Sequence, residues 1–296
     1  MPQISIIVCT RNRADVLPAC LKSIEAAVAP SPAIETELIV VDNGSTDSTA
    51  TDLRAWQQTT SSLCCKVLFA EKRGVSYAKN CGLDQATGRI LVLTDDDCRL
   101  APDYLTELVQ AYDGDVGPAL RGGRVDLGDT RALPFTIKTD LEPQQFTGGN
   151  PGGFVHGCNL TMSRSVVELV GCFDTSLGAG QPIGAAEDTD FVYRAYRAGV
   201  PVLYDPSIVV FHYHGRRDLA RIKQLQNVYN ISVRAIYAKH GSWDWRLLLH
   251  VCRNIRGGLR EYFGGPLANE EFRLSHREFL WSNLRGAILF WRGVRH

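Results

Sequence analysis

The sequence predicts an α/β protein built on a mostly parallel central sheet that helices cover on both faces. Strand and helix patterns alternate along the first hundred residues. The predicted strands are almost continuously apolar, which is typical of strands buried on both faces of a parallel sheet. Polar residues follow four successive strands directly, at the edge where such sheets bind their ligands. With 296 residues, the chain has room for one large domain or for a domain with an appendage.

Four apolar runs in the first hundred residues are the expected strands, at 4–10, 37–42, 66–70 and 89–94. A segment with helical periodicity or capping residues follows each run. The turn GSTDST, residues 44–49, supplies N-cap side chains for the second helix. The predicted helices cover residues 14–28, a segment ending near 59, 76–85 and about 102–112.

The second half of the chain is less regular. Residues 113–155 are rich in Gly, Pro and Asp and contain a strand-like run at 119–127. Two Gly-rich loops, at 147–154 and 178–188, are each followed by regular structure. We expect a strand that leads into a helix at 163–170, a helix at 187–198, short strands at 201–205 and 207–214, and mostly helix from 218 onward.

The formal net charge of zero hides a division of the chain into an acidic and a basic part. Residues 1–211 carry 17 Lys and Arg against 26 Asp and Glu, whereas residues 212–296 carry 15 against 6. We therefore expect the two parts to meet different partners.

The nine cysteines are scattered, and their number is odd without any C-x-x-C spacing. This pattern favours reduced thiols over a disulfide framework or a zinc–cysteine site. The N-terminus lacks the features of a signal peptide, and no window approaches the ~20 apolar residues that span a bilayer. We expect a cytoplasmic protein, either free or peripheral on the inner face of the membrane.

Three consecutive aspartates, Asp95, Asp96 and Asp97, follow the fourth predicted strand. Their carboxylates repel one another, and a divalent cation such as Mg²⁺ or Mn²⁺ relieves that repulsion. In extended backbone Asp95 and Asp97 face the same way, so both can reach one ion. A bound cation can also bridge a diphosphate. The competing interpretation is a solvated turn in which an aspartate caps the next helix.

Six motifs in order make the chain resemble the family 2 glycosyltransferases of the GT-A type. They are SIIVCTRNR (5–13), VVDNGSTDST (40–49), RGVSYAKNCGL (73–83), LTDDDCRL (93–100), GCNLTMSR (157–164) and EDTDFVYRAYRAG (187–199). The resemblance implies a GT-A-like three-layer α/β/α sandwich as the catalytic domain, in residues 1–215. A basic, aromatic and mainly helical extension would then form residues 216–296.

The resemblance also implies a binding site for a nucleotide-diphosphate sugar. Thr10 and Arg13 match the opening loop of the family, and Asp42 matches the aspartate that holds the base. Lys79 and Asn80 lie early in a helix whose N-terminus would face the site and favour anions. The family usually has an arginine at position 79. Alternatively, Asp42 forms a turn and Lys79 is a surface lysine.

The aspartate stretch resembles the D-x-D motif of the family, which implies a metal site. Asp97 would bind the metal, Asp95 would contact the ribose or the metal, and Asp96 would lie near the sugar. His212 or His214 would complete the metal shell, with His212 the first choice. A histidine among oxygen ligands favours Mn²⁺ over Mg²⁺, and we expect one of these two ions.

Glu187 and Asp188 match the acidic pair from which the family takes its general base. Asp188 is the first choice for the base and Glu187 the second. Alternatively, both acids are favourable charges at a helix N-terminus. Asn159 and Asp190 are expected at the acceptor site, or else as structural groups at a turn and at a helix start. Cys158 departs mildly from the family, which often has Ala or Ser there.

The expected activity is that of an inverting, metal-dependent glycosyltransferase. The donor would be a UDP, dTDP or GDP sugar, and the acceptor a hydroxyl of a saccharide or glycolipid, as in surface polysaccharide assembly. One alternative is a degenerate nucleotide-sugar-binding protein, which is expected to lose the acid pair or the aspartates. The other is a sugar nucleotidyltransferase, but CTRNRADV has no glycine for the loop of that class. A dinucleotide oxidoreductase is disfavoured because no G-x-G-x-x-G follows the first strand.

The basic C-terminal part contains four of the five tryptophans, Trp243, Trp245, Trp281 and Trp291. In its last segment, apolar residues at helical spacing are accompanied by arginines: Leu280, Leu284, Ile288, Trp291, Arg277, Arg285, Arg292 and Arg295. Such helices suit an anionic membrane surface. Packing on the catalytic domain or on a second subunit remains the alternative. Nucleic acid is not an expected partner, because no recognition motif is present.

Overall fold

The computed structural model describes residues 2–60, 63–241, 244–268 and 275–293. Two residues named above, Trp243 and Arg295, lie outside the described residues. The strands are β1 (Ile4–Thr10), β2 (Thr36–Asp42), β3 (Cys64–Phe69), β4 (Ile90–Asp95), β5 (Cys98–Leu100), β6 (Leu120–Leu127), β7 (Gln144–Gln145), β8 (Asn159–Ser163) and β9 (Val202–His212). The helices are α1 (Leu17–Val28), α2 (Thr49–Thr59), α3 (Val75–Gln85), α4 (Tyr104–Tyr112), α5 (Arg164–Val170), α6 (Glu187–Arg197), α7 (Leu219–His240), α8 (Trp245–Tyr262) and α9 (His276–Gly293).

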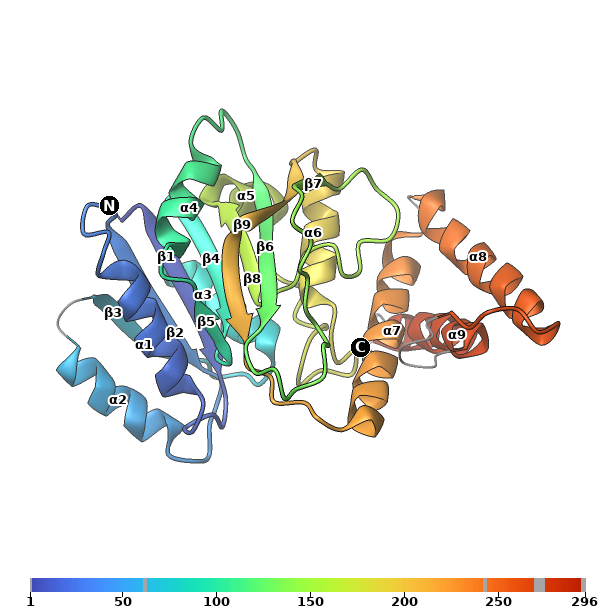
Figure 1. Ribbon diagram of the computed structural model, residues 1–296, viewed down its shortest axis with the longest axis horizontal. Coiled ribbons are helices and arrows are strands. Elements are labelled where there is room, and N and C mark those ends of the chain that lie inside the picture. Colours follow the sequence, from blue (N-terminus) through green and yellow to red (C-terminus); the bar gives the residue numbers. More distant parts are fainter. Residues whose placement is uncertain (1, 61–62, 242–243, 269–274, 294–296) are drawn as a thin grey trace.

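The described strands form one nine-stranded mixed sheet in the order β3-β2-β1-β4-β8-β6-β9-β5, with β7 paired to β9 (Figure 1). Strands β1 to β4 are parallel to their neighbours among themselves, as the apolar runs predict. Strand β8 runs against both β4 and β6. Strands β6 and β9 again run parallel to each other. Parallel strands therefore end at a common edge that includes Thr10, Asp42, Asp95 and His212.

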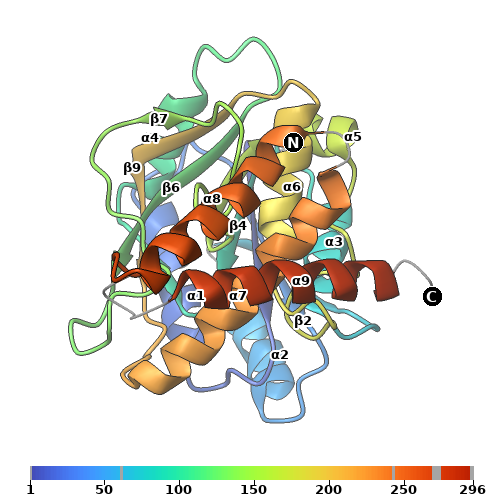
Figure 2. The ribbon, with the colours of Figure 1, turned by 90° about the vertical axis from the view of Figure 1, so that its right-hand side faces the viewer.

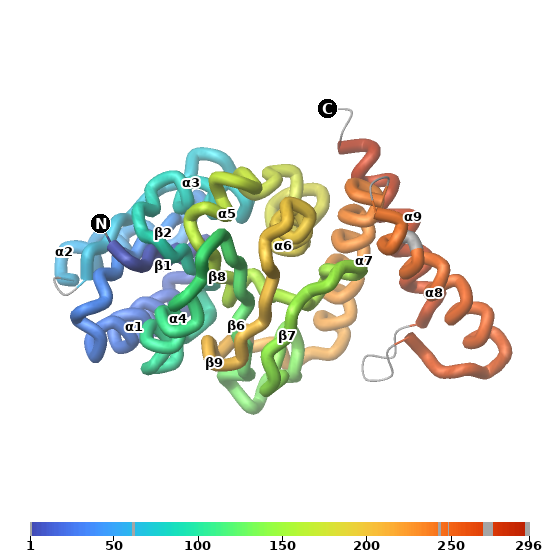
Figure 3. Tube along the Cα trace, turned by 90° about the horizontal axis from the view of Figure 1, so that it is seen from above, coloured from blue at the N-terminus to red at the C-terminus, as the bar shows by residue number. Residues whose placement is uncertain are grey.

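Helices cover both faces of this sheet, so the molecule has the three predicted layers (Figure 3). On one face, α1, α2 and α4 pack on the sheet through apolar side chains such as Leu21, Leu53 and Leu108. On the other face, α3, α5 and α6 contribute Leu83, Val166 and Phe191. Strands β1 and β4 are buried over almost their whole length, which explains why their sequences are nearly continuously apolar.

Strand β9 differs from the two short strands predicted at 201–205 and 207–214. It is one strand, because both of its ends pair with β6. The register shifts between Gly123 and Arg124, so that β9 residues 206–208 have no partner in β6. The pairing carries β9 to His212, which lies opposite Cys98 of the short strand β5. The long strand thereby delivers a histidine to the turn that contains the three aspartates.

The C-terminal part is helical, as predicted, and packs beyond α6 at one end of the molecule (Figures 1 and 2). Helix α9 crosses α7 closely: a Cβ atom at Gly286 would lie 2.5 Å from the carbonyl oxygen of Ile231. The small residues Ser282 and Gly286, one turn apart, are buried in α9. None of the described helices is both long enough and apolar enough to cross a membrane.

Candidate active site

A cavity of about 880 Å³ opens at the carboxyl edge of the sheet. Its walls come from distant parts of the chain: the ends of β1, β4 and β9, the start of α6, the loop 150–158 and one face of α7. Among its lining residues are many of the predicted site residues: Thr10, Arg13, Lys79, Asp95, Asp96, Asp97, Glu187, Asp188 and His212.

Asp95, Asp97 and His212 form a group whose ligand atoms all lie within 4.8 Å of one another. Nε2 of His212 lies 3.2 Å from Oδ1 of Asp97. Burial would lower the pKa of His212, but the hydrogen bond and the charge of Asp97 outweigh it and raise that pKa to about 9. Two carboxylates and one imidazole are ligands that suit Mn²⁺ and, less well, Mg²⁺. These three residues could therefore hold such an ion.

Asp96 faces the opening loop of the chain instead. The hydroxyl of Thr10 donates a hydrogen bond of 2.7 Å to Oδ2 of Asp96. The guanidinium of Arg13 lies 3.6 Å from Asp96 and 3.7 Å from Asp97. Burial raises the pKa of Asp96 to about 7, although Thr10 and Arg13 oppose the shift. The loop after β1 thus organises the aspartate turn.

Lys79 and Glu187 form a buried ion pair, with 2.7 Å between Nζ and Oε1. Burial alone would lower the pKa of Lys79, but the charges of Glu187 and Asp188 outweigh it and raise that pKa. Lys79 is thus no surface lysine: it is 4% exposed and lines the cavity. Of the two neighbouring acids, Glu187 is the one already bound to a cation.

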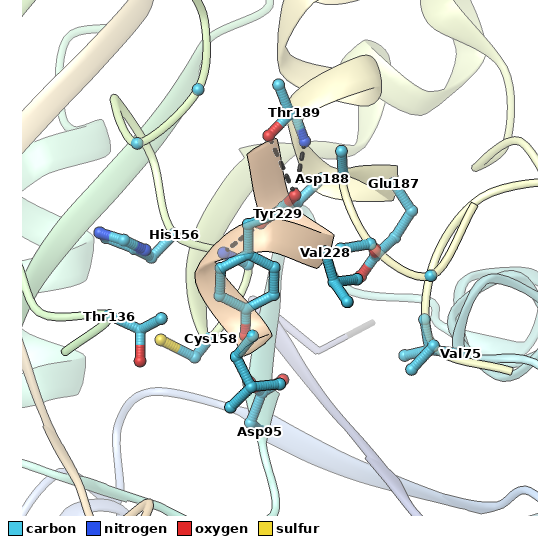
Figure 4. A pocket seen from close by; sticks show the side chains of 18 of the residues that line it. Val75, Asp95, Thr136, His156, Cys158, Glu187, Asp188, Thr189, Val228 and Tyr229 are labelled. Atoms are coloured by element: carbon cyan, nitrogen blue, oxygen red, sulfur yellow. Dashed lines mark hydrogen bonds between the residues drawn. The ribbon is translucent and has the colours of Figure 1, made fainter. Parts of the chain in front are cut away.

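Asp188 lies at the first turn of α6, directly in the cavity wall (Figure 4). The backbone amide of Gly157 donates to its Oδ2 at 2.8 Å, and that of Thr189 donates to its Oδ1 at 2.6 Å. A Cβ atom at residue 157 would lie 2.8 Å from Oδ2, so this approach requires glycine. Ala186, just before the helix, has a left-handed φ of 70°. Such backbone strain clusters at functional sites.

In the view of Figure 4, the ring of Tyr229, a residue of α7, lies between Asp95 and Asp188. Burial raises the pKa of Tyr229, and the charges of Asp95 and Asp188 add to the shift. Its ring stacks on Phe135 with 5.7 Å between the centroids. Tyr229 is thus close enough to Asp95 and Asp188 for the charges of both to act on its hydroxyl.

Two predicted asparagines are structural and do not line the cavity. Asn80 exchanges two hydrogen bonds with the backbone of Phe173, at 2.9 and 2.8 Å. Asn159 is fully buried; its amide donates to the carbonyls of Arg124 and Ile208, and its oxygen accepts from the hydroxyl of Tyr104. These contacts use the polar atoms that a sugar hydroxyl or a phosphate would need, so the structure favours a structural role for both asparagines.

Two ionisable residues expected at the site do not line the cavity, although the ring centroid of His214 lies 5.0 Å from that of His212. Asp190 is fully buried against Arg194, Lys239 and His240, outside the cavity lining. His214 accepts a hydrogen bond from the backbone of Arg216 and is not part of the Asp95–Asp97–His212 group. The first-choice histidine, His212, is the one beside the aspartates. Asp190 as an acceptor ligand and His214 as a metal ligand are therefore not supported.

Asp42 and Asn43, at the end of β2, make different contacts. Oδ1 of Asp42 accepts hydrogen bonds from the backbone and hydroxyl of Ser45, so it forms the alternative turn considered above. Asn43 lines the cavity, and its side-chain oxygen accepts from the amide of Gly74 at 2.8 Å. No sequence argument had singled out Asn43.

The sequence reasoning also missed the contribution of α7, which begins after the boundary predicted at residue 215. One face of this helix lines the cavity through Gln226, Tyr229, Asn230, Val233 and Arg234. These positions follow the i, i+3, i+4, i+7 spacing of a helix face, which was the available signal. Arg216, just before α7, also lines the cavity and donates to Thr136 at 3.1 Å.

A family model and several curated proteins match this chain. The family model described as "Glycosyl transferase family 2" matches residues 5–171. Glycosyltransferase AglE of Haloferax volcanii is 28% identical over 217 residues, covering 72% of this chain and 67% of the relative. Glucosyl-dolichyl phosphate glucuronosyltransferase of the same organism is 28% identical, covering 48% of each chain. Succinoglycan biosynthesis protein ExoM of Rhizobium meliloti is 30% identical, covering 69% of this chain and 64% of the relative. The chain thus spans about half to two thirds of these relatives.

Solved structures share the fold at low identity. Mannosyltransferase PcManGT from Pyrobaculum calidifontis, in complex with GDP-Man and Mn²⁺, aligns over 99% of this chain and 75% of its own. Its TM-score is 0.60 at 20% identity. S. aureus TarS 1-349 in complex with UDP aligns over 100% of this chain and 92% of its own, with a TM-score of 0.57 at 14% identity.

Proposed function

Because the chain belongs to glycosyl transferase family 2, we propose that it moves a sugar from a nucleotide-diphosphate sugar to an acceptor hydroxyl, with metal dependence and inversion. One observation carries this proposal. A set of metal-type ligands, Asp95, Asp97 and His212, and an acidic side chain free of any cationic partner among the described residues, Asp188, line the same cavity. Transfer by single displacement needs these two groups on opposite sides of the reacting carbon.

The aspartate side of the cavity is the proposed donor side. Asp95, Asp97 and His212 would hold Mn²⁺ or Mg²⁺, which when bound balances the charge of the departing diphosphate. Thr10 and Arg13 would contact the nucleotide, with Asn43 beside them and Asp42 shaping the loop. Arg216, which already lowers the pKa of Asp97 through its charge, is a second cation for the diphosphate. The nucleotide panel remains UDP, dTDP and GDP.

Asp188 is the proposed general base. Glu187 would have to leave Lys79 before it could accept a proton, whereas Asp188 accepts only neutral N–H and O–H donors. The acceptor oxygen would lose its proton to Asp188 as it attacks the anomeric carbon. The bond from that carbon to the diphosphate oxygen breaks at the same time, on the opposite face of the sugar.

The acceptor is proposed to be a saccharide on a lipid carrier, met at the inner face of a membrane. The names of relatives mention dolichyl phosphate and succinoglycan, which support lipid-linked and polysaccharide chemistry. The helical C-terminal part carries the positive charge of the chain and exposes several tryptophans. All nine cysteines are free, which fits a reducing compartment.

Substitution of Asp188 by Asn tests the proposed chemistry. Asn keeps the shape and accepts some hydrogen bonds, but it cannot take up the acceptor proton. We expect Asp188→Asn to lower the turnover about 10²- to 10⁴-fold while nucleotide binding with Mn²⁺ is unchanged. The matched variant Glu187→Gln should lower the thermal unfolding temperature, because it breaks the ion pair with Lys79, and should leave the pH dependence of turnover unchanged. Transfer of labelled sugar from the nucleotide sugar measures turnover in both variants, and equal turnover in Asp188→Asn and wild type would remove Asp188 as the base.

A further inference from the structure

Arg234 of α7 is a buried cation in the cavity wall. It is 8% exposed, and it lines the cavity together with Val233 and Phe279. Its Nε and Nη1 atoms have no hydrogen-bond partner within the described residues. No carboxylate in that same part of the chain forms an ion pair with it. Nothing in the catalytic scheme above uses this guanidinium.

A guanidinium in this position is costly unless an anion meets it, because burial removes most of its hydration. Two aromatic rings compensate in part: the Arg234 Cζ atom lies 4.6 Å from the ring centroid of Tyr237 and 5.7 Å from that of Phe279. These contacts leave Nε and Nη1 of Arg234 without an acceptor at hydrogen-bond geometry within the described residues. The planar guanidinium presents paired N–H donors that fit two oxygens of a phosphate.

The position of Arg234 along α7 separates it from the donor side. Arg216, which precedes the helix, is the cation whose charge acts on Asp97. Tyr229 comes next along the chain, and the charges of Asp95 and Asp188 both raise its pKa. Arg234 follows Tyr229 by five residues, about 7.5 Å farther along the helix axis. Along α7 it therefore lies farther than Tyr229 from Arg216, the cation that acts on Asp97.

The surroundings of Arg234 are glycine-rich and apolar. Val233 packs against the loop 150–153, where a Cβ atom at Gly152 would lie 3.2 Å from it. Val233 and Phe279 supply apolar lining near Arg234, and the ring centroid of Phe279 lies 5.7 Å from the Cζ atom of Arg234. Phe279 belongs to α9, whose outer face exposes Trp281 and Trp291. A ligand here would place an anion on Arg234 and an apolar chain towards α9.

We propose that Arg234 binds the phosphate group of a lipid-phosphate-linked acceptor. This inference rests on the proposed function, since it assigns the acceptor side of the same cavity. It also explains why α7 and α9, which lie outside the predicted catalytic domain, take part in the cavity. The phosphate would fix the carrier, and the sugar hydroxyl beside it would reach Asp188.

Calorimetric titration with farnesyl phosphate tests the proposal. The protein is first saturated with Mn²⁺ and the nucleoside diphosphate that binds it, so that the donor side is filled. We expect farnesyl phosphate to bind wild type, and about tenfold or more weakly to Arg234→Gln. Arg234→Lys, which keeps the charge without the paired donors, should be intermediate. Arg89→Gln, at an exposed arginine directly before β4, is the matched control and should bind as wild type.

Two further probes identify the source of the anion. Farnesol and inorganic phosphate should each bind far more weakly than farnesyl phosphate. Inorganic phosphate binding as tightly as farnesyl phosphate would overturn the lipid part of the proposal. Unchanged affinity of farnesyl phosphate in both Arg234 variants, with wild-type thermal unfolding, would overturn the whole.

The same samples separate this proposal from the proposed function. If Arg234→Gln weakens binding of the nucleoside diphosphate instead, the guanidinium contacts the donor and the proposal is wrong. If no nucleoside diphosphate binds wild type, the proposed function fails, whereas an Arg234-dependent response to farnesyl phosphate would still establish the anion site.

Discussion

Asp190 shows at the scale of one residue how a predicted ligand can be a structural anchor. Its fully buried carboxylate contacts Arg194, Lys239 and His240, each at 2.8 Å. Burial would raise the pKa of Asp190, but the hydrogen bond from His240 and the charges of Lys239 and Arg194 hold it well below its usual range. The start of α6, which carries Asp188, is thereby tied to the end of α7.

Substitution of Asp190 by Asn should destabilise the protein by about 3 kcal/mol at pH 7, because it leaves three partly buried basic groups without their buried carboxylate. The depressed pKa makes the contribution of Asp190 complete above its unfolded pKa of about 3.9 and smaller as pH falls below it. Urea unfolding should therefore show the gap between wild type and variant narrowing by about 1 kcal/mol from pH 5 to pH 3. A gap that stays constant over this range would contradict the assignment.

Residue chemistry was most informative where topology brings strand ends together. Thr10, Asp95 and Asp97 meet because ends of adjacent parallel strands share an edge. Asn80 and Asn159 carry the same polar groups, but backbone atoms of distant segments satisfy them. The sequence does not reveal which backbone groups lack partners, so a structural asparagine and a binding asparagine look alike.

At the scale of elements, the outer faces of α8 and α9 expose large apolar side chains that do not pack within the described residues. Helix α9 buries Ser282 and Gly286 and exposes Trp281 and Trp291 at 66% and 60%. Helix α8 exposes an apolar stripe that includes Trp245, at 67%. The neighbouring surface positions carry arginines: Arg253, Arg256, Arg260, Arg277, Arg285 and Arg292. This combination is typical of helices that lie on anionic membranes.

Replacing both Trp281 and Trp291 by Ser should weaken binding to vesicles that contain phosphatidylglycerol about tenfold or more, because two exposed indoles can no longer enter the interface. Vesicle co-sedimentation measures this, and added salt should weaken the wild-type interaction. Leu169→Ser, at a 55% exposed position of α5, is the control. Equal binding of the double variant and wild type would favour the second-subunit alternative.

The regular elements of the first half were predictable because each buried strand is a short apolar run that ends in polar residues. Strand β1 covers the predicted residues, Ile4–Thr10. Strands β5 and β7, of three and two residues, were missed because they carry too few positions for any periodicity. The full length of β9 depends on pairing with β6, which is a long-range contact that no local pattern encodes.

At the scale of the whole molecule, the cavity joins the acidic and the basic parts of the chain. Asp95 and Asp188 come from the acidic part, whereas Arg216 and Arg234 come from the basic part. The cavity therefore combines acidic groups from the first part of the chain with arginines from the second part. The boundary at residue 215 remains a prediction, and α7 contributes to the proposed catalytic unit across it.

The most direct test of the central claim is calorimetric titration of UDP, dTDP and GDP into wild type and Asp97→Asn, each with and without Mn²⁺. The account predicts that one nucleotide binds tightly, that binding requires Mn²⁺, and that Asp97→Asn loses it because a metal ligand is removed. Thermal unfolding confirms that the variant is folded. Failure of all three nucleotides to bind folded wild type, or Mn²⁺-dependent binding that survives in Asp97→Asn, would contradict the account.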